Sequence, residues 1–153
     1  MTDVQPARTR SARWSPAQRF AAAFGAVYVL VGAAGFAVTG FSDFAGMDHH
    51  QLVIFAVNPL HNVIHLALGL AWLATAPRHR FARLANLTIG GVLGLVTVLG
   101  FVGGMGMLGM SGLADPDNFL HLATATLALY FGSAGAESAQ TRDGDVAEEP
   151  ALR

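Results

Sequence analysis

The sequence contains neither cysteine nor lysine, and only 12% of its 153 residues are charged. Without cysteine, the chain forms no disulfide framework and no thiolate site. Because 53% of the residues are hydrophobic, the few charged side chains cannot cover the surface of a soluble globule of this size. The composition therefore favours a membrane protein.

Charged residues are absent from three long stretches, Phe20 to Phe41, Gln51 to Pro77 and Leu84 to Ala114. An apolar helix of about 20 residues crosses a hydrocarbon layer roughly 30 Å thick, because a helix satisfies its own backbone groups there. A further apolar run follows Asp117. We therefore predict an all-α, polytopic membrane protein with four transmembrane helices, at about 20–41, 55–76, 84–108 and 117–135.

The distribution of charge predicts the orientation of these helices. All nine basic residues are arginine, and they lie before residue 20, at 78–83 and after residue 141. The two other connections carry no arginine and hold the aspartates Asp43, Asp48, Asp115 and Asp117. The positive-inside rule then places both termini and the central arginine loop in the cytoplasm. We predict unstructured cytoplasmic ends at 1–18 and 137–153, around a domain at 19–136 in the cytoplasmic membrane.

Two helix boundaries remain open. Pro59 either kinks a long second span, or it stands in the first turn of a helix capped by Asn58. The third span carries eight glycines between Leu84 and Met110, and its excess length requires either a tilt or unwinding at the GGMGMLGM end.

Glycines four residues apart let helices approach closely, so the glycine-rich faces of the first and third spans indicate a surface for a homodimer.

The second and fourth spans repeat one polar pattern. NPLHNVIHLALGLAWL and DPDNFLHLATATLALY align so that Asn62 matches Asn118 and His65 matches His121. The first and third spans also align, at an offset of 65 residues against 56 for the second and fourth. Because each copy contains two spans, the sequence predicts a duplicated helical hairpin with both copies inserted the same way up.

This pattern predicts a polar cluster that consists of Asn58, His61, Asn62, His65, Asp117, Asn118 and His121. Spacings of three and four residues bring these side chains to one side of each helix. An unpaired imidazole or amide inside a membrane costs a few kcal/mol. We therefore expect the cluster to face the interior of the bundle near its outer side, where its members bond one another.

The cluster admits three interpretations. In the first, a structural clasp holds the hairpins in register through Asn62, His65, Asn118 and His121. In the second, facing histidines hold haem iron, or a divalent metal ion is held by His61, His65, Asp117 and His121. In the third, the histidine pair handles protons, because histidine titrates near neutral pH.

Other functions find less support in the sequence. Every aspartate and glutamate lies in a loop, in a tail or at a helix edge, whereas a small exporter would place a carboxylate within a span. No nucleophile elbow accompanies Ser111, and the arginines are too few and too close to the membrane for nucleic acid. We expect a non-enzymatic integral membrane protein in the lipid bilayer, with a haem- or metal-binding redox component as the alternative.

The segments LHNVIHLALGLAWL and DNFLHLA resemble a bacterial and archaeal membrane protein family catalogued as domain of unknown function 4383. In that family an HNxxHL element recurs in the second span and a DNxLHL-like element opens the fourth. In this chain the two elements fall on His61, Asn62, His65 and Leu66 and on Asp117, Asn118, His121 and Leu122. The resemblance covers about Arg19 to Gly132 and implies the four-helix fold and topology, but no activity.

Overall fold

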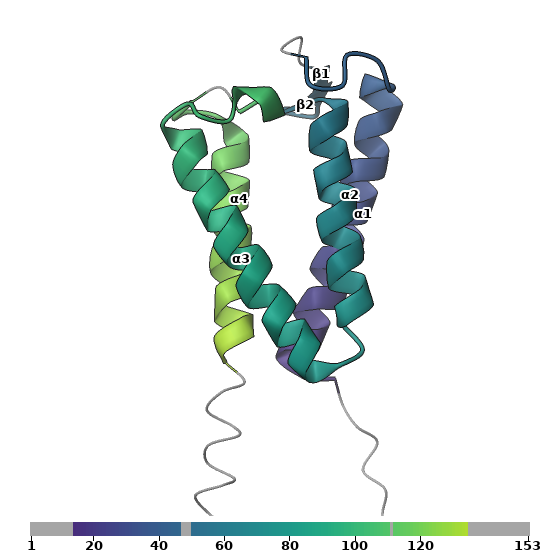
Figure 1. The fold of residues 1–153 in the computed structure, drawn as a ribbon, viewed down its shortest axis with the longest axis vertical. Helices are drawn as coiled ribbons and strands as arrows, with labels where there is room; N and C mark the ends of the chain where they lie inside the picture. Colours follow the sequence, from purple (N-terminus) through teal and green to yellow (C-terminus); the bar gives the residue numbers. More distant parts are fainter. Residues whose placement is uncertain (1–13, 47–49, 111, 135–153) are drawn as a thin grey trace, which may run out of the picture.

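The computed structural model describes residues 14–46, 50–110 and 112–134 (Figure 1). These residues are mostly helical, and their four α-helices are α1 (Pro16–Thr39), α2 (Pro59–Thr75), α3 (His79–Phe101) and α4 (Pro116–Ser133). α1 packs along α2 and α3 packs along α4, so two helical hairpins form, and α3 also contacts α1 and α2. Of the predicted unstructured ends, residues 1–13 and 137–153 lie outside the described residues.

Three of the helices begin with a capping side chain followed by proline, at Ser15–Pro16, Asn58–Pro59 and Asp115–Pro116. Proline suits the first helical position because the N–H that it lacks has no partner there in any case. α1 therefore begins inside the segment predicted to be an unstructured lead. α2 begins at Pro59, so this proline starts the second helix and does not kink it.

α3 begins at His79 and ends at Phe101, earlier at both ends than the span predicted at 84–108. Beyond it, Gly103 and Gly109 have positive φ angles of 77° and 89°, which a right-handed helix cannot contain. The chain continues there as a 3₁₀-helix, η1 (Gly106–Leu108). Of the two alternatives for the glycine-rich segment, the structure shows unwinding.

A short β-hairpin, which the sequence did not predict, adds to the mostly helical fold. β1 (His50–Leu52) pairs antiparallel with β2 (Phe55–Val57). The β-branched and aromatic residues of QLVIFAV favour strands, and Val53 and Ile54, which connect the two strands, are 84% and 60% exposed. The apolar residues before Asn58 therefore form this hairpin, and the second helix begins at Pro59, after the start predicted at about residue 55.

The connections gather at opposite ends of the bundle (Figure 1). The start of α1, the α2–α3 connection and the end of α4 lie at one end, which we call the arginine end because Arg78, Arg80 and Arg83 lie there. The β-hairpin and η1 lie at the other, which we call the strand end. α2 and α4 both begin at the strand end, so their first turns lie close to the connections gathered there.

The outer faces of the helices are apolar. Leu30, Leu70, Leu95 and Leu127, one from each helix, are 67%, 57%, 60% and 41% exposed. α1 and α3 are each long and apolar enough to cross a membrane, and only 28% and 33% of their most apolar windows are buried. Because the core helix of a soluble protein is mostly buried, this exposure indicates membrane association.

Two contacts at the arginine end have the same form in the two hairpins. Gln18 Nε2 of α1 donates to the backbone oxygen of Ala76, just after α2, at 3.0 Å. Arg83 Nε of α3 donates to the backbone oxygen of Gly132 in α4 at 2.9 Å. Arg83 lies 65 positions after Gln18, and Gly132 lies 56 positions after Ala76.

The helices of each hairpin also approach each other at a glycine. A Cβ added at Gly25 of α1 would lie 2.9 Å from Leu73 Cγ and from the backbone oxygen of Gly69, both on α2. A Cβ added at Gly90 of α3 would lie 3.1 Å from Leu129 Cγ on α4. Gly90 lies 65 positions after Gly25, and Leu129 lies 56 positions after Leu73, so the same two offsets recur.

Candidate functional site

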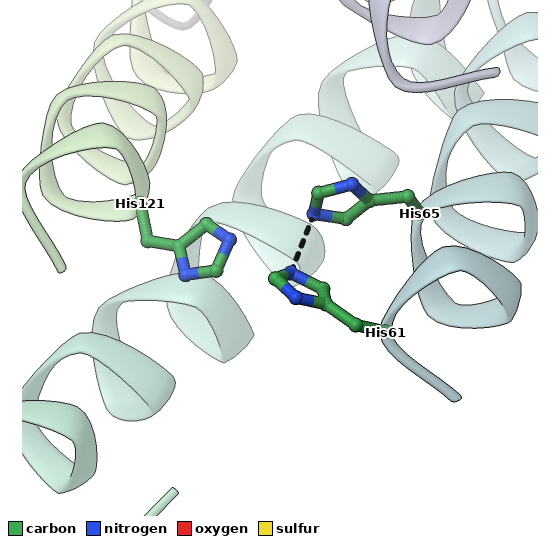
Figure 2. A group of neighbouring side chains, drawn as sticks. All are labelled: His61, His65 and His121. Atoms are coloured by element: carbon green, nitrogen blue, oxygen red, sulfur yellow. Dashed lines mark hydrogen bonds between the residues drawn. The ribbon is translucent and has the colours of Figure 1, made fainter. Parts of the chain in front are cut away.

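Three histidines meet between the two hairpins (Figure 2). His61 and His65 project from α2 and His121 projects from α4, and they are 1%, 5% and 3% exposed. One ring nitrogen from each histidine lies within 4.8 Å of the others. His61 Nε2 and His65 Nε2 are hydrogen-bonded at 3.1 Å, whereas neither ring nitrogen of His121 has a hydrogen-bond partner among the described residues. The cluster is therefore buried but incompletely bonded.

The start of α2 fixes the direction of its two histidines. Asn58 caps the helix by accepting a hydrogen bond from His61 N at 2.9 Å. Its Nδ2 donates to the backbone oxygens of Met107 and Gly46, at 2.8 and 3.3 Å, and so ties the helix to two connections at the strand end. Because His61 and His65 are four residues apart, they share one face of α2. Asn58 therefore belongs to the frame of the site, outside its centre.

Asp117 faces the ring nitrogen of His61 that does not contact His65. It is 1% exposed, and its Oδ2 lies 3.9 Å from His61 Nδ1. A histidine that binds a metal through one nitrogen commonly donates its other N–H to a carboxylate, which fixes the tautomer and the direction of the ring. Of the four predicted metal ligands, the three histidines bring their ring nitrogens together, whereas Asp117 lies beyond His61, at a distance longer than a hydrogen bond.

Each of the two asparagines of the predicted cluster donates a hydrogen bond within its own hairpin. Asn62 Nδ2 donates to Thr39 Oγ1 of α1 at 3.0 Å, and Asn118 Nδ2 donates to a backbone oxygen of the connection before α4 at 2.7 Å. The side-chain oxygen of Asn62 lies where a Cβ on Gly35 would stand, and that of Asn118 lies where a Cβ on Gly100 would stand. The asparagines thus position α2 on α1 and α4 on α3.

Tyr28 and Thr39 of α1 contribute to the site without having been predicted from the sequence. The Tyr28 ring lies 4.9 Å from the His65 ring, centroid to centroid, and Thr39 accepts the hydrogen bond from the Asn62 amide. Both residues continue the three- and four-residue spacing of the small residues of α1 that pack on α2. In the sequence, these two residues can be recognised as polar side chains on the face of α1 that otherwise carries small residues.

A cavity of about 180 Å³ adjoins the histidines. The three histidines line one part of it, and aliphatic side chains from α2, α3 and η1 line the rest: Ile64, Leu68, Val92, Leu93, Val96 and Leu108. The polar groups of the site thus open onto an apolar space.

A metal ion suits this geometry better than haem. Bonds of about 2.0–2.1 Å from zinc to nitrogen place the ligand atoms of a tetrahedral ion about 3.3 Å apart, close to the 3.1 Å between the His61 and His65 nitrogens. Two histidines four residues apart on one helix face are also a known zinc-binding arrangement. Haem needs space for a macrocycle between its axial ligands, and the cavity of about 180 Å³ is smaller than the roughly 300 Å³ of pockets for larger ligands.

Comparison with known proteins confirms the resemblance drawn from the sequence. A family model described as "Domain of unknown function (DUF4383)" matches residues 18–134, which include every histidine, asparagine and aspartate of the cluster. No curated protein and no solved structure matches the chain significantly. The family description assigns no activity. The chain belongs to the family described as domain of unknown function (DUF4383).

Proposed function

We propose that this protein is an integral membrane protein that binds one divalent transition-metal ion between its two helical hairpins. The observation that carries the proposal is the set of three buried imidazoles, whose ligand atoms lie within 4.8 Å of one another. A buried polar group without a partner costs about 1–3 kcal/mol, and both ring nitrogens of His121 are in this state among the described residues. An ion held by His61, His65 and His121 satisfies one nitrogen of each ring and joins α2 to α4.

The donor set selects the class of metal. Imidazole suits zinc, copper, iron and nickel, whereas calcium and magnesium prefer oxygen ligands. Three histidines leave the fourth position of a tetrahedral ion open. Asp117 orients His61 through Nδ1 in this arrangement, and its negative charge partly balances that of the ion.

All four helices cross the cytoplasmic membrane in this proposal. α2 and α4 have 17 and 18 residues, which correspond to about 25–27 Å and lie near the lower limit for a hydrocarbon layer of roughly 30 Å. Their outer faces expose large apolar side chains, as those of α1 and α3 do. Within the described ranges, every arginine and aspartate lies in a connection or in the first two turns of a helix. This distribution of charge supports four spans.

The proposal includes an internal duplication. Its support is the set of contacts whose partners keep the offsets of 65 and 56 residues: Gln18 and Arg83 with their backbone acceptors, Gly25 and Gly90 with their leucines, and Gly35 and Gly100 with their asparagines. Low-complexity apolar sequence produces chance matches, but it does not make paired contacts recur at two fixed offsets. The two copies then enter the membrane the same way up, with the arginine end in the cytoplasm.

Metal content of the purified protein tests the site. Wild-type protein that is purified in detergent and equilibrated with Zn²⁺ is expected to retain one ion per chain by elemental analysis. Its absorption spectrum is expected to lack a Soret band. His121→Gln leaves only two imidazoles and is expected to reduce the retained zinc at least tenfold. His79→Gln is the matched control, because His79 is exposed at the start of α3 and its loss is expected to leave the zinc content unchanged.

Thermal unfolding separates a metal site from a polar clasp. A ligand present at 100 times its Kd stabilises the folded state by about 2.7 kcal/mol. A chelator is therefore expected to lower the melting temperature of the wild type and to leave that of His121→Gln unchanged. If the wild-type protein retains no zinc and melts at the same temperature with and without chelator, the metal site is contradicted. The polar clasp is then the interpretation of the cluster that remains.

A further inference from the structure

The cavity beside the histidines is lined by α2 on one side and α3 on the other. His61, His65 and His121 are at most 5% exposed, whereas Val92, on the α3 side of the cavity, is 47% exposed. The histidines thus form the buried end of the cavity, and Val92 is the most exposed side chain of its lining, so we place the mouth beside Val92, between α2 and α3. In a protein that spans the membrane, this mouth faces lipid.

The size and lining of the cavity restrict what it can hold. Apolar cavities of about 150 Å³ bind benzene, so a cavity of about 180 Å³ accommodates one six-membered ring with a small substituent. A charged molecule is disfavoured, because it would lose its hydration among aliphatic side chains. A purely apolar ring would leave both nitrogens of His121 unpaired, whereas a hydroxyl group can donate a hydrogen bond to an imidazole nitrogen.

We infer that the cavity binds a neutral phenol-type ring that enters from the bilayer, with its hydroxyl group at the histidines and its ring against α3. The same chemistry is offered by a free phenol and by a phenol with a lipid tail, which would extend through the mouth beside Val92. The inference goes beyond the metal site and does not require it. The hydroxyl group meets a free imidazole nitrogen, or the open position of the ion when the metal is bound.

Photolabelling in phosphatidylcholine vesicles tests the inference. The probe is a phenol that carries a small diazirine on the ring, and the labelled peptides of the wild-type protein are identified by mass spectrometry. We expect the label on the segments of α2 and α3 that line the cavity. Unlabelled phenol is expected to halve the labelling at a concentration at least tenfold lower than benzene, which has the ring but no hydroxyl group.

Two valine substitutions on α3 form a matched pair. Val92→Phe fills the mouth and is expected to reduce labelling at least tenfold. Val98→Phe makes the same change at a position that is 60% exposed and does not line the cavity, and labelling is expected to stay at the wild-type level. 4-Octylphenol is expected to compete if the natural ligand carries a lipid tail, and only phenol competes if it is a free molecule.

Equal competition by benzene and phenol would overturn the inference, as would labelling that Val92→Phe leaves unchanged. The comparison of the two competitors uses wild-type protein, so it holds even if Val92→Phe fails to fold. Zinc content is measured on the same vesicles. Labelling without zinc contradicts the metal site alone, and zinc without labelling contradicts this inference alone.

Discussion

Asp117 holds the position in the second hairpin that His61 holds in the first, 56 residues earlier. These two side chains face each other, with His61 Nδ1 at 3.9 Å from Asp117 Oδ2. A second histidine at residue 117 would itself need a partner in the buried site. The carboxylate oxygen is not hydrogen-bonded to His61 Nδ1 at 3.9 Å, but it can accept a hydrogen bond from this nitrogen once the two atoms move closer. In the proposed metal site, a contact of this kind would fix the tautomer of His61 and leave its Nε2 to bind the ion.

Asp117→Asn is expected to weaken zinc binding by about 10–100-fold, the usual effect of removing a partner that orients a metal ligand. The amide keeps the shape of the side chain but removes its charge, so the site is expected to fill with one ion only at higher zinc concentrations. Titration of the metal-free protein with Zn²⁺ in competition with a chromogenic chelator measures the change.

Asp115→Asn is the matched control for this prediction. Asp115 caps α4 by accepting a hydrogen bond from Asp117 N at 3.0 Å, and asparagine caps helices as well as aspartate does. The same charge is then removed two residues away, while the helix start is kept. Equal loss of zinc affinity in the two variants would assign the effect to net charge and not to the contact with His61.

The backbones of α1 and α2 touch at Gly25 and Gly69. A Cβ added at Gly69 would lie 2.7 Å from Val29 N and 2.8 Å from Gly25 O, and neither backbone atom can move away without moving α1. Gly69→Ala is therefore expected to lower the free energy of unfolding by about 1–3 kcal/mol, the usual cost of overpacking. Denaturant unfolding of the purified protein in detergent measures this loss.

Gly94→Ala on α3 provides the comparison, because no described atom lies within 4 Å of the added Cβ apart from its own helix and chain neighbours. Alanine also loses less backbone entropy in a helix than glycine, by about 0.5–1 kcal/mol. This variant is expected to unfold at the same denaturant concentration as the wild type or at a higher one. If Gly69→Ala is as stable as Gly94→Ala, the close approach of α1 and α2 does not limit stability.

The sequence predicts the helices well because apolar, charge-free runs have one stable conformation in a membrane. Their ends depend on local chemistry: the caps at Ser15 and Asn58 set the starts, and Gly103 turns the chain after α3. The β-hairpin was not predicted because its turn places Val53 at φ 62°, a conformation that β-branched residues rarely adopt. No local pattern therefore marks this turn.

The centre of the site was predictable in part, because a pattern written twice in the sequence marks His65 and His121. Their partners were not predictable, because they depend on distances between helices. Asn62 finds Thr39 of α1, 23 residues away. His61, although it interrupts the repeat, was among the predicted metal ligands, and it does lie in the centre of the cluster. Sequence spacing identifies the face of one helix, but only the packing of two hairpins shows which faces meet.

At the scale of the whole molecule, several polar side chains are buried while large apolar side chains are exposed on the outer faces of the helices. Asn62, Asn86 and Asn118 are at most 1% exposed, whereas Leu30 and Leu95 are at least 60% exposed. This polarity is unfavourable in water and favourable in lipid. In the proposed orientation, with the arginine end in the cytoplasm, the histidines would lie toward the outer side of the membrane, where an ion could reach them without crossing the whole bilayer.

Cysteine labelling tests this orientation against a background without cysteine. We expect single cysteines at Ser42 and Leu113, both exposed near the strand end, to react with a membrane-impermeant maleimide in intact cells. Cysteines at His79 and Ser133, both exposed at the arginine end, are expected to react only after lysis. If all four cysteines react in intact cells, or if none reacts, the helices do not separate these ends across a membrane. Either result also removes the lipid-facing mouth of the cavity, because the mouth faces lipid only if α2 and α3 lie within the bilayer. If only the cysteines at His79 and Ser133 react, the orientation is the reverse of the proposed one.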